Sequence, residues 1–324
     1  MTARDESATI LLTSPIDQAG IEILEQAAPV VTAPAPDEAT LTKLLPGAIG
    51  LVVRGEGKAT APMIEAAADL EVIGRPGAGF DSVDVEAATA RGIPVVFAPI
   101  GGFAVAEGAL ALLLALVKML PYCDRIVRGG EWNRRYDFAT GDISGHTVGI
   151  VGLGRIGRHL VRLLEPFGAK LLGYDPHVAP AALNGLQVEL TSLEELLGRS
   201  DYVSLHPLLN GQTRGMINRE RMALMRPGSI LVNLSRGGVV DSLDALAEAL
   251  DEGRLAAVGL DVFPDEPPDV SHRIFSDPRC LFAPHALGAS SMAMDRICRS
   301  MATDMVRVIN GEPPEHCVNP QVLE

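Results

Sequence analysis

Short apolar runs alternate with amphipathic, helix-like stretches along most of the chain. The first series of runs predicts strands at residues 10–14, 51–54, 71–75 and 94–98. A second series predicts strands at residues 147–151, 170–175, 202–206, 229–235, 257–263 and 281–285. The runs are almost continuous in apolar residues, which is typical of strands that are buried on both faces. Alternation of strand and helix predicts an α/β protein with parallel sheets and helices on both sides of each sheet.

Two further segments predict long helices. Residues 101–120 form one of them, and it separates the two series of strands. Its most apolar part, residues 109–117, is too short to span a bilayer, so it predicts a fully buried helix. Residues 290–310 predict a final helix after the last strand. A length of 324 residues favours two domains over one.

Composition excludes several classes of partner. The formal net charge is −14 and the sequence pI is about 5.0, which argues against binding to nucleic acid or to an anionic membrane. The N-terminal residues contain no long apolar run, so no signal peptide is expected. Four scattered cysteines form no CxxC pair and are typical of reduced thiols in a cytoplasmic protein. No HExxH or His-x-His spacing occurs, and we expect no metal.

A glycine-rich loop follows the strand predicted at residues 147–151. Gly152 permits a tight turn, Gly154 lets backbone N–H groups approach a pyrophosphate, and Gly157 lets helix and strand pack closely. The positive end of the following helix favours phosphate at this place. Asp175 ends the next predicted strand, where a carboxylate accepts hydrogen bonds from the adenosine ribose and repels a 2′-phosphate. The pattern therefore predicts an NAD site, whereas a structural turn is the alternative.

Three further motifs, in this order, complete a pattern around the glycine loop. They are LVNLSRGGVVD (231–241), AAVGLDVFPDEPP (256–268) and APHALGAS (283–290). With them the chain resembles the D-isomer-specific 2-hydroxyacid dehydrogenases, and within that family it is most similar to D-3-phosphoglycerate dehydrogenases through residues 52–60 and 73–96. The resemblance implies two Rossmann-like domains. An NAD-binding domain at 100–289 is inserted in a flavodoxin-like substrate domain made of 1–99 and 290–324.

The chemistry of hydride transfer to a 2-keto acid explains the three motifs. Arg236 offers a planar fork that binds the substrate carboxylate. His285 is the expected proton donor to the carbonyl oxygen, and it acts as the base in the oxidation direction. Glu266 is expected to favour the imidazolium form and to fix the orientation of the ring. Taken singly, each residue has a structural alternative: a loop cap, a solvent-facing carboxylate or a buried histidine.

The resemblance also implies weaker assignments. For the cofactor these are Arg155 and Ile156 at the pyrophosphate, Asp261 at the nicotinamide carboxamide, and His206, Thr213, Leu234 and His285 nearby. For the substrate they are Arg54 and the backbone of Gly77, Ala78 and Gly79, together with Arg236. Trp132 and Arg135 fall in a stretch implied to lie near the interface of a homodimer.

The substrate side departs from the pattern of phosphoglycerate enzymes. Gly55 and Gly57 stand where hydroxyl residues are usual, and the loop before Val105 carries Gly102 and Phe103 in place of an asparagine. Reduction of glyoxylate or hydroxypyruvate therefore stays open beside oxidation of D-3-phosphoglycerate. A non-catalytic, NAD-sensing corepressor is the alternative from another functional class.

Overall fold

The computed structural model describes residues 8–183 and 185–324. The chain divides into two compact units. We call the residues up to Gly101 together with Ser290–Glu324 the outer unit, and Gly102–Ala289 the central unit. The sequence placed the corresponding boundaries after residues 99 and 289.

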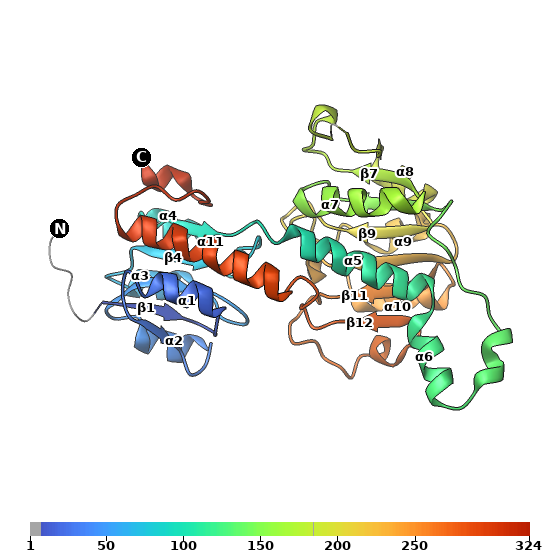
Figure 1. Cartoon of the computed structure of the whole chain (residues 1–324), viewed down its shortest axis with the longest axis horizontal. Helices are drawn as coiled ribbons and strands as arrows, with labels where there is room; N and C mark the ends of the chain where they lie inside the picture. Colours follow the sequence, from blue (N-terminus) through green and yellow to red (C-terminus); the bar gives the residue numbers. More distant parts are fainter. Residues whose placement is uncertain (1–7, 184) are drawn as a thin grey trace. The chain divides into compact units, whose positions relative to one another are not determined.

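The outer unit is built on a five-stranded parallel sheet of order β2-β1-β3-β4-β5, the order typical of flavodoxin-like folds. Its strands are β1 (Thr9–Leu12), β2 (Val30–Thr32), β3 (Ala48–Val52), β4 (Val72–Arg75) and β5 (Val95–Phe97). Its helices are α1 (Gln18–Leu24), α2 (Glu38–Leu44), α3 (Ala61–Ala66), α4 (Val85–Ala90) and α11 (Ser291–Ile309). Helix α11 lies near the C-terminal end of the sequence and packs beside α1 (Figure 1).

The central unit contains a seven-stranded parallel sheet of order β12-β11-β10-β9-β6-β7-β8. Its strands are β6 (Thr147–Val151), β7 (Lys170–Tyr174), β8 (Glu189–Leu190), β9 (Tyr202–Leu205), β10 (Ser229–Asn233), β11 (Leu255–Leu260) and β12 (Cys280–Phe282). The strand order reverses between β6 and β9, as it does in dinucleotide-binding sheets. Ligands of such sheets bind at the carboxyl ends of the strands beside this reversal.

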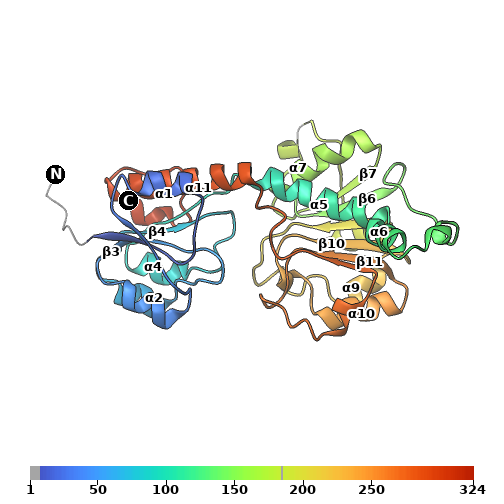
Figure 2. The ribbon, with the colours of Figure 1, turned by 60° about the horizontal axis from the view of Figure 1, so that its bottom comes forward.

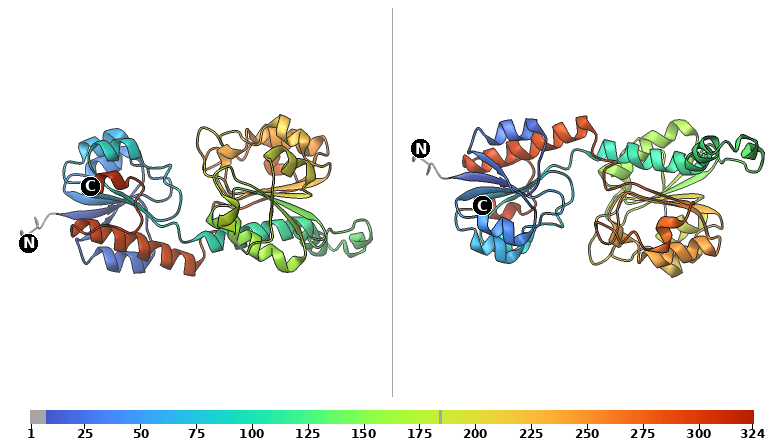
Figure 3. Two further views of the ribbon diagram at one scale, coloured as in Figure 1. Left: turned by 90° about the horizontal axis from the view of Figure 1, so that it is seen from above. Right: turned by 90° about the horizontal axis from the view of Figure 1, so that it is seen from below.

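Helices cover both faces of the central sheet (Figures 2 and 3). They are α5 (Gly102–Val117), α6 (Leu120–Arg128), α7 (Arg155–Leu164), α8 (Leu193–Arg199), α9 (Arg219–Leu224) and α10 (Leu243–Asp251). One core lies under α5 and α7 and includes Leu113, Ile150 and Leu160. The other lies under α8, α9 and α10 and includes Leu196 and Leu246. The predicted α/β class with two Rossmann-like parts is confirmed.

Residues 101–120 do not form the single helix that the sequence predicted. Helix α5 ends at Val117, Met119 adopts a left-handed backbone with φ 51°, and α6 begins at Leu120. The prediction of a fully buried helix was also wrong, because Ala111 is exposed on the outer side of α5. In the described part of the chain no single helix is long and apolar enough to cross a membrane. Only α5 and α6 taken together meet that requirement, by length and composition, and a bend of 57° separates them.

Candidate active site

The glycine loop links β6 to α7 and has the geometry of a nucleotide cradle. A Cβ at Gly157 would lie 2.0 Å from the carbonyl oxygen of Gly152, so only glycine lets the helix approach the strand this closely. Gly152 has a φ of +92°, and a Cβ there would lie 2.7 Å from the carbonyl carbon of His206. A Cβ at Gly154 would meet no atom within 4 Å. The loop is therefore packed on its inner side and open at the N-terminus of α7, where a pyrophosphate fits.

Asp175 lies directly against this loop. Its Oδ2 accepts a hydrogen bond from the N–H of Leu153 at 2.8 Å, and its Oδ1 accepts one from the N–H of His177 at 2.9 Å. Arg155 and Ile156 form the first turn of α7, the turn whose N–H groups point out of the helix end. The predicted ribose and pyrophosphate residues thus gather around one helix terminus.

His206 follows β9 on the other side of the strand reversal. Its backbone N–H donates to the carbonyl of Val151 at 2.7 Å, which ties it to the end of β6. Its Nε2 lies 2.8 Å from Oγ of Ser204, and its Nδ1 has no hydrogen-bond partner among the described residues. Burial lowers the pKa of His206 to about 4, so the ring is neutral at pH 7. In this form His206 offers hydrogen-bonding nitrogens and no positive charge to the site.

Arg236, Glu266 and His285 follow three adjacent strands, β10, β11 and β12, at the same edge of the sheet. The Nδ1 of His285 lies 2.7 Å from Oε2 of Glu266, and Oε1 of Glu266 accepts the N–H of Phe263 at 3.1 Å. Burial opposes ionisation of Glu266, but the bonds from His285 and Phe263, with the nearby charge of Arg236, hold its pKa below the ordinary value. His285 thus contacts Glu266 directly, and Arg236 lies near enough for its charge to stabilise that carboxylate.

Backbone contact between two loops makes this convergence possible. A Cβ at Gly237 would lie 1.9 Å from the carbonyl carbon of Phe263, so the loop of Arg236 packs directly on the loop that carries Glu266. Buried Asn233 shapes the first loop: its Nδ2 donates to the carbonyl of Arg236 at 2.9 Å, and its Oδ1 accepts the N–H of Ser235 at 3.0 Å. Sequence reasoning missed Asn233, whose only signal is an amide at the end of a strand.

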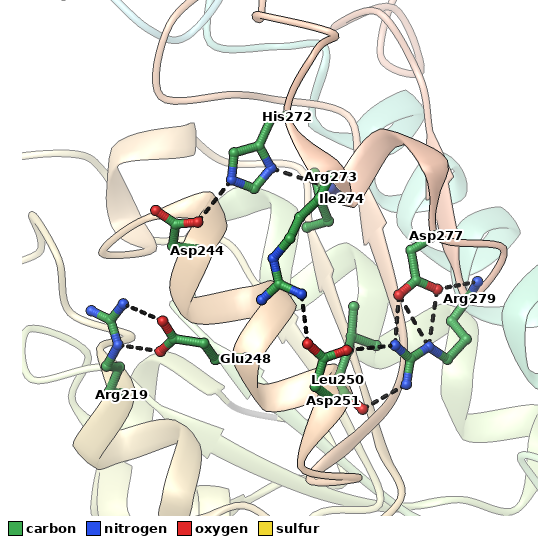
Figure 4. Close-up of polar contacts among 10 residues, drawn as sticks. All are labelled: Arg219, Asp244, Glu248, Leu250, Asp251, His272, Arg273, Ile274, Asp277 and Arg279. Atoms are coloured by element: carbon green, nitrogen blue, oxygen red, sulfur yellow. Dashed lines mark hydrogen bonds and ion pairs between the residues drawn. The ribbon is translucent and has the colours of Figure 1, made fainter.

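The segment after Glu266 is attached to the acidic face of α10 (Figure 4). Nε2 of His272 lies 3.0 Å from Oδ1 of Asp244, while its Nδ1 accepts the N–H of Ile274 at 3.2 Å. Farther along, Asp251 binds Arg273 at 2.5 Å and Arg279 at 3.2 Å. Exposed pairs of this kind contribute little individually, but several of them fix the path of the loop that presents Glu266.

The other predicted cofactor residues of the central unit have mainly structural contacts. Thr213 Oγ1 donates to the carbonyl of Leu208 at 2.5 Å and accepts the N–H of Asn210 at 2.8 Å, which closes the loop after His206. The side chain of Leu234 is buried in the core under α5. The carboxylate of Asp261 accepts backbone N–H groups rather than pointing to solvent. Their roles in binding a cofactor stay predictions.

The predicted substrate residues Arg54 and Gly77–Gly79 lie in the outer unit. Arg54 follows β3, and its guanidinium donates to the carbonyl of Pro15. Its backbone N–H donates to Oγ1 of Thr13 at 2.9 Å, and that hydroxyl donates back to the Arg54 carbonyl at 2.9 Å. Gly77 follows the neighbouring strand β4 with a φ of +131°. Both positions therefore lie at the carboxyl edge of the outer sheet, the edge at which such sheets bind ligands.

No group of three or more His, Cys, Asp or Glu side chains within 8–183 and 185–324 could hold a metal ion. The expectation that the protein needs none stays a prediction. The four cysteines are free thiols, and burial raises the pKa of Cys280 to about 12. The central unit thus places a carboxylate, an imidazole and a guanidinium at the edge of the sheet that also carries the glycine loop.

Comparison with known proteins yields one family. The family described as "D-isomer specific 2-hydroxyacid dehydrogenase, NAD binding domain" matches residues 110–286. A D-3-phosphoglycerate dehydrogenase of Methanocaldococcus jannaschii is 38% identical over 312 residues, which cover 96% of this chain and 59% of that protein. The chain thus spans about three-fifths of the length of this relative.

Solved structures give the same result. A D-lactate dehydrogenase from Aquifex aeolicus complexed with NAD and lactic acid has a TM-score of 0.87 at 27% identity, covering 96% of this chain and 99% of that one. A glyoxylate reductase from Paecilomyes thermophila also has a TM-score of 0.87, at 28% identity, covering 97% of this chain and 99% of that one.

Proposed function

Because the chain belongs to the D-isomer-specific 2-hydroxyacid dehydrogenase family, we propose that it is an NAD-dependent oxidoreductase that interconverts a 2-hydroxy acid and its 2-keto acid. The observation that carries the proposal is the 2.7 Å contact between Glu266 and His285 beside Arg236. A carboxylate, an imidazole and a guanidinium at the carboxyl edge of a nucleotide-binding sheet suit proton transfer to a polarised carbonyl.

The chain's own residues divide the work as follows. Arg236 binds the carboxylate of the substrate and polarises the adjacent carbonyl. Because Nδ1 of His285 is directed at Glu266, its Nε2 is the nitrogen that gives a proton to the carbonyl oxygen, or accepts it from the hydroxyl. Glu266 holds the ring in this orientation through Nδ1. Bound NAD(H) supplies or accepts the hydride.

The residues present fit the nicotinamide cofactor. The open side of Gly154 and the first turn of α7 would hold the pyrophosphate. Asp175 would accept hydrogen bonds from the ribose, and its negative charge favours NAD over NADP. Neutral His206 would line the cofactor site without adding charge.

We propose D-3-phosphoglycerate as the first substrate to test, supported by the relative from M. jannaschii. The second candidate is glyoxylate or hydroxypyruvate, favoured by Gly55 and Gly57, which offer no hydroxyl to a phosphate, and by the similarity to a glyoxylate reductase. The test is NADH oxidation with pyruvate, glyoxylate, hydroxypyruvate, phenylpyruvate and 3-phosphohydroxypyruvate side by side. NADH binding without turnover of any of the five would favour the corepressor alternative.

We also propose a homodimer, formed through α5, α6 and the 3₁₀ helix Trp132–Tyr136 that follows α6. This segment exposes the large apolar side chains of Leu120, Val127, Trp132 and Tyr136. Several exposed apolar side chains on one segment are typical of a protein–protein interface. Arg135 lies 4.8 Å from the ring centre of Trp132. Light scattering should give twice the chain mass of 34.2 kDa, and a monomer mass would contradict the proposal.

The four free thiols support a cytoplasmic location.

A further inference from the structure

The backbone of His285 adopts a conformation that its side chain does not favour. Its φ is +54°, in the left-handed region, and Met119 is the only other described non-glycine residue with a positive φ. An L-residue in this region costs about 1–2 kcal/mol, so it persists only where the surroundings hold it. Something in the fold therefore fixes the backbone of the proposed proton donor.

Asp261 makes the contacts that do this. Its Oδ1 accepts the N–H of Ala286 at 2.9 Å, and its Oδ2 lies 3.3 Å from the N–H of Leu287. Successive N–H groups after a left-handed residue form a concave anion site, and here the anion is a carboxylate of the protein itself. Asp261 is 3% exposed and follows β11 directly, with its own N–H bonded to the carbonyl of Asn233 at 3.0 Å. The carboxylate is thus held by the sheet.

The other side of the loop is held by close packing. A Cβ at Gly108 of α5 would lie 2.7 Å from Cβ of Leu287. Ala283 also donates its N–H to the carbonyl of Leu260 at 2.9 Å, which aligns the end of β12 with β11. The residues after His285 are therefore fixed by Asp261 on one side and by α5 on the other.

From these contacts we infer that Asp261 is a positioning residue for His285. It stabilises the left-handed turn that directs Nδ1 at Glu266 and leaves Nε2 for the substrate. This role deepens the proposed function and rests on it. It differs from the contact with the nicotinamide carboxamide that the resemblance implied. Burial disfavours the charged carboxylate of Asp261 and so raises its pKa. The two N–H groups partly oppose that rise.

Two substitutions distinguish the two roles. Asp261→Ala removes the acceptor, so His285 relaxes and turnover falls about 100-fold or more, the loss typical of a misplaced general acid. Asp261→Asn loses the Oδ2 acceptor but keeps Oδ1, which accepts the N–H of Ala286 at 2.9 Å and also lies 3.4 Å from the N–H of Leu287, so it should recover most of that turnover. Under the positioning role the NADH dissociation constant, measured by fluorescence, changes less than about threefold in either variant. Asp304→Ala is the matched control, because Asp304 is equally buried and accepts the N–H groups of Glu315 and His316 in the outer unit.

A second readout needs neither substrate nor cofactor. In the ¹⁵N-histidine spectrum of the unliganded protein, the bonded Nδ1–H of His285 should give a downfield proton signal, assigned by its loss in His285→Gln. The signal should vanish in Asp261→Ala and persist in Asp261→Asn and Asp304→Ala. Persistence in Asp261→Ala overturns the inference. The inference is also overturned if both Asp261 variants lose NADH affinity to the same extent but keep normal turnover at saturating NADH. If Asp261→Ala does not fold, loss of the signal in Asp261→Asn overturns it.

Failure of the proposed function has a different signature. In that case the unmodified chain turns over none of the five keto acids, while the spectrum still reports whether Asp261 holds His285.

Discussion

The imidazole of His285 and the carboxylate of Glu266 are joined through Nδ1 and Oε2 at 2.7 Å, and the second carboxylate oxygen is occupied by the N–H of Phe263. The carboxylate thus has one oxygen for the loop and one for the ring. The ring is thus held through Nδ1, and under the proposed function Nε2 is the nitrogen that serves the substrate. This division predicts what happens when the charge is removed without changing the shape.

Glu266→Gln should lower turnover by about 100- to 10,000-fold while NADH affinity stays near that of the unmodified chain. The amide oxygen can still accept the N–H of Phe263, which leaves an NH₂ group facing Nδ1. His285 must then accept at Nδ1 and carry its proton on Nε2, so it can no longer act as a base in the oxidation direction. Steady-state rates in both directions measure the effect. Asp265→Asn removes the same charge from a neighbouring exposed residue and should leave both rates unchanged. An equal loss in Asp265→Asn would mean that net charge in the loop, and not the pair, matters.

Gly154 and Gly157 should respond differently to the same added methyl group. Gly157→Ala places a Cβ 2.0 Å from the oxygen of Gly152 and should destabilise the fold by about 1–3 kcal/mol or more. Gly154→Ala meets no protein atom within 4 Å, so its melting temperature should stay close to that of the unmodified chain. It should nevertheless weaken NADH binding, because the methyl group occupies the side open to the pyrophosphate. Calorimetry and fluorescence titration measure the two effects. Unchanged NADH affinity in Gly154→Ala would place the pyrophosphate elsewhere.

Asp175→Ala should weaken binding of NADH far more than binding of NADPH. The carboxylate is the expected acceptor for the ribose hydroxyls, and its charge repels a 2′-phosphate. Its removal also frees the N–H of Leu153, now bonded at 2.8 Å, so part of the loss falls on both cofactors. Asp175→Asn keeps one acceptor oxygen, so it is the control for the part of the affinity loss that comes from the freed N–H of Leu153. Competition titrations with both cofactors give the ratio, and equal losses in Asp175→Ala would contradict this account of cofactor choice.

Much of the central sheet could be predicted because its strands are buried runs. Arg236, Glu266 and His285 were predicted from three motifs that resemble a known family, and the structure places them after strands that are neighbours at one edge of the sheet. Strands β2 and β8 were missed because they contain three and two residues and carry exposed positions. The break at Met119 was missed because a left-handed residue inside an apolar stretch leaves no composition signal.

The contacts that support the site could not be predicted from the sequence either. Asn233 and Asp261 bind backbone groups, and those bonds depend on loop conformations that no side-chain pattern encodes. The left-handed φ of His285 is itself a product of these contacts. The motifs thus predicted residues that the structure brings to one edge of the sheet, whereas the backbone contacts that hold them came only from the structure.

His206 should make the protein less stable as the solution is acidified. Its pKa is about 4 in the folded chain against 6.5 for the free side chain, so the unfolded chain binds the proton first. The free energy of unfolding therefore falls as the pH drops from 6.5 towards 4, by an amount on the order of 3 kcal/mol for this group. His206→Gln keeps a polar group near Ser204 but has nothing to protonate, so its urea midpoint should fall less over that interval. Ser204→Ala keeps the histidine and its burial, the cause of the low pKa, and should retain the full dependence. Parallel midpoints for the unmodified chain and His206→Gln would show that the buried ring is not the group that titrates.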